Sequence, residues 1–328
     1  MRPTRLTLVF AIFAALVLVP AAAVAQSTYP SRVIRIVVPF PAGGATDVFA
    51  RHYAQRMSGL LGQQVIVENK SGAAGTIGTL DVARSEPNGY TMLFGTASIF
   101  ALYNSMSKNP KFDVLKDFIP IAELGASPVT FDAHPKTPGD FKAIVARAKA
   151  NPGKLQYGSP GTGTFLHLAA ERLKQEVGGL DITHIPYRGG GPAMADLVAG
   201  QIPLAVDAVS TSLQHHREGR VRILAVASAK RSPLLPEVPT FDEALGTKGF
   251  VATLWNAVAV PAGTPADVVD KLHDATNKVL ADKSFAEQMI KIGIETSPPR
   301  TLKETREFIA QEQARWKPVV EAAGVSSD

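Results

Sequence analysis

Segments rich in β-branched residues alternate with helical segments along most of this chain. The first covers residues 31–40, ends in a Pro-Phe-Pro-Ala-Gly-Gly turn and is followed by a helical pattern over residues 47–61. A strand that leads through a glycine turn into a helix is typical of α/β folds, whose strands are mostly parallel. The sequence therefore predicts an α/β protein with mostly parallel sheets.

Further segments extend this alternation. Strands are expected over residues 64–68, 91–94, 128–132, 155–158, 182–186, 203–206, 222–227 and 255–260. Cap, proline and acidic residues begin helices at residues 137–140 and 264–267, and Asn-Pro-Gly at 151–153 ends the first of these. Thr301 and Glu304 form a capping box for a last helix. Parallel sheets bind ligands beyond the carboxyl ends of their strands, so the loops there are the candidate sites.

The N-terminus is typical of a secretory signal peptide. Arg2 and Arg5 precede an apolar run over residues 6–19, and the small residues Ala23 and Ala25 favour cleavage after Ala25. The run is shorter than the ~20 residues that a membrane span needs. Export to the periplasm is therefore expected, with residues 1–25 removed. The remaining chain is long enough for about two domains of ~100–200 residues each.

Composition narrows the classes of partner. The chain has no cysteine, so neither a disulfide nor a lipid-modified cysteine is available after export. Its net charge is +5, or +3 without the two leader arginines, and the basic residues form no cluster. A nucleic-acid or anionic-membrane surface is therefore not indicated, and small anions are plausible ligands.

The glycine turn after the first strand is one candidate ligand loop. Adjacent glycines leave backbone N–H groups uncovered at a helix start, where unpaired amides and the helix dipole favour an anion such as a carboxylate. Asp47 either complements the same helix end or accepts hydrogen bonds from the loop, and a structural role is favoured for it. The candidate residues are Phe40, Pro41, Ala42, Gly43, Gly44, Ala45, Thr46 and Asp47.

A second loop, over residues 157–164, repeats this design. Hydroxyl groups here add donors without charge, and His167 lies one turn into the following helix. Its imidazole has two equally open roles, as a donor to a ligand or as a structural partner of Ser159. The candidate residues are Ser159, Gly161, Thr162, Gly163, Thr164 and His167.

Two further positions follow strands. Tyr187 and Arg188 stand before three glycines that begin a helix, and Arg188 is a secondary candidate to bind a carboxylate. Asp207 follows the strand at 203–206, but no second carboxylate lies near it in sequence. Its expected role is to accept a hydrogen bond from a ligand or a loop rather than to act as a catalytic acid.

Enzyme and cofactor motifs fail on inspection. The Gly-Thr-Gly at residues 161–163 lacks the third glycine of a dinucleotide fingerprint, and Thr164 stands where a phosphate loop needs lysine. Tyr157 occupies the position where a Gly-x-Ser-x-Gly elbow around Ser159 needs glycine. No His-Glu-x-x-His or thiolate set exists. Nucleotide binding and a serine hydrolase are therefore disfavoured, and no metal or other cofactor is expected.

Seven short motifs follow one another along the mature chain. They run from Tyr-Pro-Ser-Arg through Pro-Phe-Pro-Ala-Gly-Gly-Ala-Thr-Asp at residues 29–47, and then lie at 67–75, 87–91, 150–155, 185–189, 228–232 and 259–265. In this order they resemble the Bug-type periplasmic solute receptors of tripartite tricarboxylate transporters. Each motif alone is weak, but together they cover essentially the whole mature chain.

The resemblance implies a periplasmic binding protein type II-like fold, with two α/β lobes joined by a two-crossing hinge. Lobe 1 would hold residues 26–124 plus 229–328, and lobe 2 residues 125–228. The lobes would close over a small organic anion, a carboxylate or dicarboxylate, with the two candidate loops contributing from opposite lobes. The resemblance also implies delivery of this ligand to integral membrane transporter subunits, without catalysis, by a protein we expect to be monomeric.

Positions at which family members vary leave the ligand open. Ser98, Asp207 and Trp255 are such positions, and Trp255 and Phe40 are candidates to stack on an aromatic acid, although a core position suits Trp255 equally well. Two other functions stay open at this point. One is a secreted hydrolase that uses Ser159 and His167, and the other is a ligand receptor for a sensor kinase.

Overall fold

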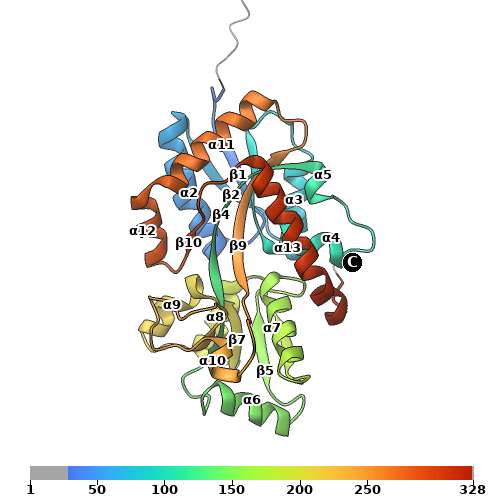
Figure 1. Ribbon diagram of the computed structural model, residues 1–328, viewed down its shortest axis with the longest axis vertical. Coiled ribbons are helices and arrows are strands. Elements are labelled where there is room, and N and C mark those ends of the chain that lie inside the picture. The colour runs from blue at the N-terminus through green and yellow to red at the C-terminus, as the bar shows by residue number, and fades with distance from the viewer. Residues whose placement is uncertain (1–28, 327–328) are drawn as a thin grey trace, which may run out of the picture.

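A computed structural model describes residues 29–326, which fold into two lobes stacked along the long axis of the molecule (Figure 1). The strand pairings define lobe 1 as residues 29–124 and 256–326, and lobe 2 as residues 128–252. The expected signal peptide lies outside the described residues. None of the helices within the described range is long and apolar enough to cross a membrane.

Lobe 1 is built on three parallel strands. β1 (Ile34–Val38) lies between β2 (Val65–Asn69) and β3 (Thr91–Thr96). Alternate β1 residues pack under α2 (Ala45–Leu61), while Val37 joins the core cluster on the opposite face. The other lobe 1 elements are η2 (Ala73–Gly75), α3 (Thr76–Ala83), η3 (Ser98–Leu102), α4 (Tyr103–Met106), α5 (Val114–Asp117), α11 (Ala266–Ala281), α12 (Lys283–Lys291) and β10 (Glu295–Thr296).

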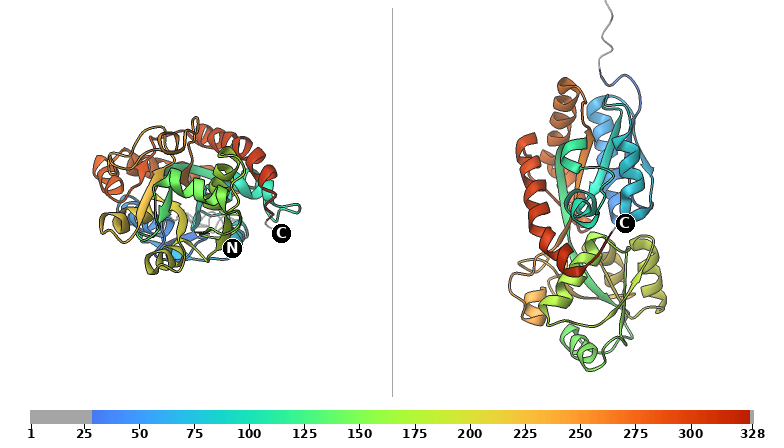
Figure 2. Two further views of the ribbon diagram at one scale, coloured as in Figure 1. Left: turned by 90° about the horizontal axis from the view of Figure 1, so that it is seen from below. Right: turned by 90° about the vertical axis from the view of Figure 1, so that its right-hand side faces the viewer.

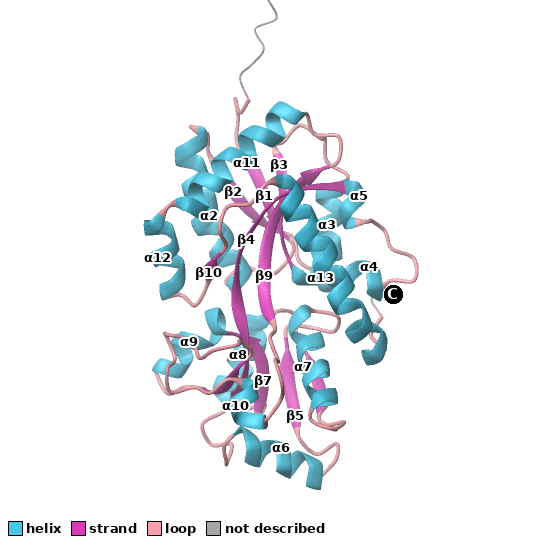
Figure 3. Cartoon of the chain, viewed as in Figure 1, coloured by secondary structure: helices cyan, strands magenta, loops and turns pink. Residues whose placement is uncertain are grey.

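Lobe 2 repeats the parallel arrangement. β5 (Gln156–Ser159) lies between β6 (Thr183–Pro186) and β7 (Leu204–Ala208), and β8 (Arg222–Val226) pairs with the far end of β4 (Phe118–Ala133). Its helices are α6 (Phe141–Ala150), α7 (Phe165–Glu176), α8 (Gly190–Ala199), α9 (Val209–Arg217) and α10 (Phe241–Leu245). α2 of lobe 1 and α7, α8 and α9 of lobe 2 each follow the carboxyl end of a parallel strand, which turns their N-termini toward the boundary between the lobes (Figure 3).

Two long strands connect the lobes. β4 and β9 (Thr253–Pro261) run side by side in opposite directions from one lobe into the other (Figure 1). The expected predominance of parallel pairing is therefore wrong: four strand pairs are parallel and five are antiparallel. β4 and β9 account for every antiparallel pair, because both strands pass between the lobes and each direction of passage needs its own strand.

The return crossing also differs from the expected one near residues 227–230. Residues 229–252 stay with lobe 2: Val226 bridges to Thr240, the Ala252 N–H donates to the Ala227 carbonyl, and Phe241 packs edge-to-face on Phe141. The chain re-enters lobe 1 only along β9. The expected lobe boundary at 228/229 is thus about 25 residues too early, because an irregular stretch with one short helix follows β8.

The expected strands are otherwise present, but β4 begins at Phe118 rather than at residue 128. Pro120, Glu123 and Gly125 obscure the strand pattern in the sequence, and the pairing with β9 shifts register at two places among them. Gly125 has φ +152°, and a Cβ there would lie 2.5 Å from the Glu295 carbonyl oxygen of β10. Glycine is thus required where β10 approaches the connecting strand.

The last helix contacts both lobes. α13 (Leu302–Ala323) begins with the expected capping box of Thr301 and Glu304 and runs along lobe 1 to reach α7 of lobe 2 (Figure 2). There Trp316 packs edge-to-face on Phe165, with ring centroids 4.4 Å apart. The expected hinge of two crossings is therefore accompanied by a helix that spans the same boundary.

Candidate functional site

A cavity with a water-accessible volume of about 80 Å³ lies between the lobes. This volume holds several water molecules or one small ligand and excludes a polymer. Lobe 1 contributes Phe40, Pro41, Ala42, Gly44, Ala45, Thr46, Thr96 and Ser98, and lobe 2 contributes Pro160, Thr164, Leu166, Gly189, Gly190, Gly191, Pro192, Asp207 and Thr211, with Leu254 from the connecting strand β9. The two candidate loops thus meet from opposite lobes.

The first loop is held by Asp47, which lies beneath it. The buried Asp47 carboxylate accepts hydrogen bonds from the Gly43 N–H at 2.9 Å, from Arg51 at 3.0 Å and from Asn69 at 2.9 Å. Burial opposes ionisation of Asp47, but these donors outweigh it and hold the pKa of the carboxyl below its usual value. Asp47 shapes the loop and does not line the cavity, as the structural interpretation expected.

The loop that Asp47 supports ends at the start of α2. No side chain of the described residues caps α2, whose first residues, Ala45 and Thr46, line the cavity. α8 likewise begins without a side-chain cap, at Gly189 and Gly190, on the opposite wall. Two helix N-termini therefore face one small space, an arrangement that favours an anion.

Ser98 joins the lobes directly. Its Oγ accepts the backbone N–H of Phe165, the first residue of α7, at 2.9 Å, and both groups are buried. Close by, Pro41 and Gly189 meet across the boundary, since a Cβ built on Gly189 would lie 3.0 Å from the Pro41 side chain. The structure therefore shows the two lobes in contact, with Ser98 satisfying the first free amide of α7.

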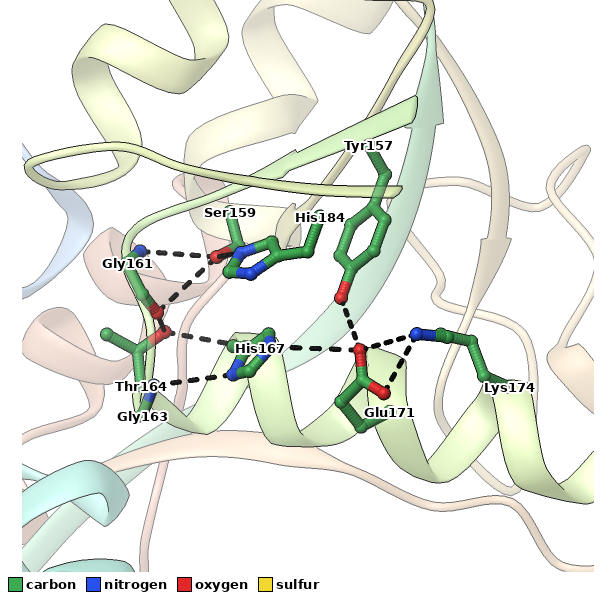
Figure 4. Close-up of polar contacts among 9 residues, drawn as sticks. All are labelled: Tyr157, Ser159, Gly161, Gly163, Thr164, His167, Glu171, Lys174 and His184. Carbon is green, nitrogen blue, oxygen red and sulfur yellow. Dashed lines mark hydrogen bonds and ion pairs between the residues drawn. The ribbon is translucent and has the colours of Figure 1, made fainter. Parts of the chain in front are cut away.

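The second loop turns two of its candidate side chains away from the cavity. Ser159 is fully buried, and its Oγ lies 2.6 Å from Nε2 of His184 on β6 (Figure 4). His167 accepts the Gly163 N–H at Nδ1, at 3.3 Å, so the proton of the neutral ring is on Nε2. Thr164 Oγ1 donates to the Gly161 carbonyl at 2.8 Å. These bonds lie within lobe 2 and fix the shape of the loop.

A polar network continues behind this loop (Figure 4). His167 stacks on His184, with ring centroids 4.0 Å apart, and His167 Nε2 lies 3.7 Å from Glu171, which also accepts from Tyr157 and Lys174. Burial lowers the pKa of both histidines, that of His184 to about 4, so both rings are neutral at pH 7. The contacts of His167 are structural, but its partners are Gly163 and His184 and not Ser159 as expected.

The remaining candidates fall into three groups. Gly161, Thr162 and Tyr187 line a hollow that adjoins the cavity and shares Phe40, Pro41 and Thr164 with it. Gly43, Asp47, Ser159, Gly163 and His167 support the loops from behind. Trp255 is a core residue, which donates from Nε1 to Glu312 at 3.1 Å and packs near Phe100, so it lines neither space.

Several cavity residues were not among the predicted site residues, although Pro160 lies in the second candidate loop and residues 189–192 belong to the glycine segment after Arg188. Thr96, Pro160, Leu166, Pro192, Thr211 and Leu254 line the cavity together with the three glycines 189–191. Thr96 is the last residue of β3, and Thr211 lies in the first turn of α9, three residues after the end of β7. The carboxyl ends of parallel strands indicate ligand contact, so this rule could have found both. His184 lies opposite Tyr157 in the β5–β6 register, which the sequence does not fix.

The hydrolase alternative required Ser159 to pair with His167. In the structure Ser159 pairs with His184, at a fully buried position outside the cavity, and His167 bonds to Gly163. A nucleophile must reach its substrate, and Ser159 cannot do so from there. Among the described residues, no group of three or more His, Cys, Asp or Glu side chains could hold a metal ion.

Comparisons with known proteins agree with this geometry. Residues 49–325 match the family model of the tripartite tricarboxylate transporter family receptor. Protein BugT of Bordetella pertussis is 38% identical over 99% of both chains. The structure of Rpa4515 of R. palustris with adipate superposes with a TM-score of 0.86 at 32% identity, covering 91% of this chain and 99% of that one.

A second similar structure holds a different small acid. MatC of Rhodopseudomonas palustris, with bound malate, superposes with a TM-score of 0.83 at 30% identity and covers 89% of this chain and 100% of that chain. The family match spans most of the chain, and the relatives match in fold as well as in sequence. This chain therefore belongs to the receptor family of the tripartite tricarboxylate transporters.

Proposed function

We propose that this protein is a periplasmic receptor that encloses a small carboxylic acid between its two lobes and delivers it to integral membrane transporter subunits. The observation that carries the proposal is the cavity between the lobes, onto which the uncapped N-termini of α2 and α8 open from opposite walls. Family membership supports the same conclusion, and so do the relatives whose structures hold adipate and malate.

The proposed binding mode uses backbone amides and hydroxyl groups rather than an arginine clamp. The cavity lining contains no Lys or Arg among the described residues, and Thr46, Thr96 and Ser98 supply hydroxyls. Enclosed neutral donors bind a carboxylate without the desolvation cost of a buried cation. Arg188 lines the adjoining hollow, where it stays a secondary candidate.

The proposal extends to the features that the resemblance implied. The protein acts as a monomer without catalysis, cofactor or nucleic-acid partner, and it reaches the periplasm after cleavage behind Ala25. The buried position of Ser159 argues against hydrolysis. A receptor for a sensor kinase would bind its ligand in the same cavity. Ligand binding therefore does not distinguish this role from transport, and identification of the partner protein does.

The test is a thermal-shift screen of mono-, di- and tricarboxylic acids followed by calorimetry. A ligand at 100 times its Kd adds about 2.7 kcal/mol to the free energy of unfolding. We expect at least one small carboxylic acid to raise the Tm, with an affinity that changes little between low and moderate salt, because enclosed contacts are screened weakly. A panel in which no acid binds would overturn the proposal.

A further inference from the structure

Asp207 is the ionisable residue of the cavity. Of the described residues that line it, every other is apolar, glycine, proline or a neutral hydroxyl residue. Asp207 is the fourth residue of the five-residue strand β7, at the edge where ligands of parallel sheets bind. The cavity thus presents a carboxylate to a ligand that is itself an acid.

One oxygen of this carboxylate lacks a hydrogen-bond donor. Asp207 is 2% exposed, and its Oδ1 accepts the Ala208 N–H at 2.9 Å. Its Oδ2 is buried and has no partner among the described residues. Burial raises the pKa of Asp207 to about 6, against the opposing effects of the Ala208 N–H and the Thr211 hydroxyl.

Only glycine fits beside this oxygen at the start of α8. Gly190 lies against it, and a Cβ built there would be 2.9 Å from Asp207 Oδ2. Any larger residue at the start of α8 would press on the oxygen. The neighbouring buried acid, Asp132 on β4, also has one buried oxygen without a partner, Oδ1, while its Oδ2 accepts from the Ser212 and Thr130 hydroxyls. Unlike Asp207, Asp132 does not line the cavity.

A buried acceptor without a donor costs free energy, and in a binding cavity the missing donor is available from the ligand. A second carboxylate placed there would bring two negative charges together and would leave Oδ2 unpaired. We propose that Asp207 is a specificity-determining residue that selects acids carrying an O–H or N–H donor on the carbon chain over the unsubstituted acid of equal length. This inference rests on the proposed receptor function and narrows its ligand class.

The donor can be a hydroxyl or an ammonium group, and the experiment separates them. Calorimetry compares three four-carbon diacids, namely succinate, its 2-hydroxy form and its 2-amino form, and then the three five-carbon counterparts. For the unmodified protein we expect at least one substituted acid to bind about 10-fold tighter or more than the unsubstituted one, since a hydrogen bond to a charged group is worth about that factor.

Asp207→Asn keeps the shape of the side chain and removes its charge. We expect the preference for the substituted acid to fall about 10-fold or more, because the amide nitrogen can donate to the carboxylate that Asp207 repels. A ligand ammonium would lose most of its affinity, whereas a ligand hydroxyl would keep most of it through the amide oxygen. The ratio of affinities is the readout, since a merely structural change would weaken all acids alike.

Asp132→Asn is the matched control, because it makes the same side-chain change at an equally buried acid on the adjacent strand outside the cavity. We expect it to leave the ratio unchanged, and thermal unfolding checks that both variants fold. A ratio that is equal in the unmodified protein and Asp207→Asn would overturn this inference alone, as would equal binding of substituted and unsubstituted acids. If none of the six acids nor any acid of the wider screen binds, the proposed function and this inference fail together.

Discussion

We expect the hydrogen bond between the Ser98 hydroxyl and the Phe165 N–H to favour the form of the protein in which the lobes are closed. Ser98 belongs to lobe 1, while the N–H that it accepts begins α7 of lobe 2. The hydrogen bond therefore exists only while the lobes are in contact. In an open form the same N–H would be hydrated. Ser98→Ala should consequently penalise the closed form and leave the open form unaffected.

The magnitude follows from the burial of both groups. Removing one partner of a buried hydrogen bond leaves the other unsatisfied, at a cost of about 1 to 3 kcal/mol. Since only the closed form bears this cost, the ratio of closed to open molecules should fall about 5- to 150-fold, and ligand affinity should fall with it. The free energy of the open form relative to the unfolded chain should not change, because the open form lacks this bond.

The assay is a distance measurement between the lobes. The sequence has no cysteine, so Lys142→Cys on α6 and Lys283→Cys on α12 introduce the sole sites for a pair of spin labels. We expect Ser98→Ala to shift the ligand-free distance distribution toward longer values. Because Ser98 also lines the cavity, the ligand-free measurement separates closure from a lost ligand contact.

Ser127→Ala is the matched control. Ser127 Oγ accepts the N–H of Ser210, in the first turn of α9, at 3.0 Å. The same kind of bond is lost there, but it joins the connecting strand β4 to lobe 2 and not lobe 1 to lobe 2. Ser127→Ala should lower the Tm without changing the distances between the lobes. Unchanged ligand-free distances in Ser98→Ala, together with a loss of Tm as large as that of Ser127→Ala, would refute the reasoning.

Three further predictions concern the loops. Asp47→Asn should lower the free energy of unfolding at pH 7 by about 1.5 to 3 kcal/mol, the range for hydrogen bonds to a charged group. Urea unfolding should show that this loss shrinks as the pH falls below 4, because a carboxyl with a lowered pKa stabilises the fold only while it is ionised. The lowered pKa values of His167 and His184 imply that the free energy of unfolding falls from pH 6.5 toward pH 4, by at most about 1.4 kcal/mol per pH unit for each histidine. If the free energy of unfolding of a His184→Gln variant depended on pH as steeply as that of the unmodified protein, this would be contradicted. Gly189→Ala should weaken ligand binding and enlarge the radius of gyration, since φ is +112° and the new Cβ meets Pro41 of the other lobe; unchanged scattering and affinity would count against it.

The sequence predicts the strands within each lobe well, because their own residues favour a strand without any help from tertiary contacts. β1 contains Ile, Val and no glycine or proline, and the capping box at Thr301 marks α13 without any tertiary contact. β4 is different. Its first half contains Pro120 and Gly125, which local rules count against a strand, and only the pairing with β9 makes it one.

The loops were found from the sequence, but the directions of their side chains were not. Tyr157 and Ser159 are two residues apart in β5, so they share one face, and Tyr157 is a core residue. This period of two indicates that Ser159 points inward, and it was available before the structure. The partner of Ser159 was not, because His184 reaches it only through the pairing of β6 with β5.

The path of the chain through β4 and β9 has a consequence for the order of folding during export. The chain leaves lobe 1 within β4 and returns along β9, so lobe 2, residues 128–252, is one uninterrupted stretch that can fold as it emerges. Lobe 1 must wait, because Leu93 of β3 pairs with Ala259 of β9, which leaves the translocation channel much later. Until then β3 presents an unpaired edge, and closing so long a loop is slow. The half of the receptor that is made first is therefore the half that is completed last.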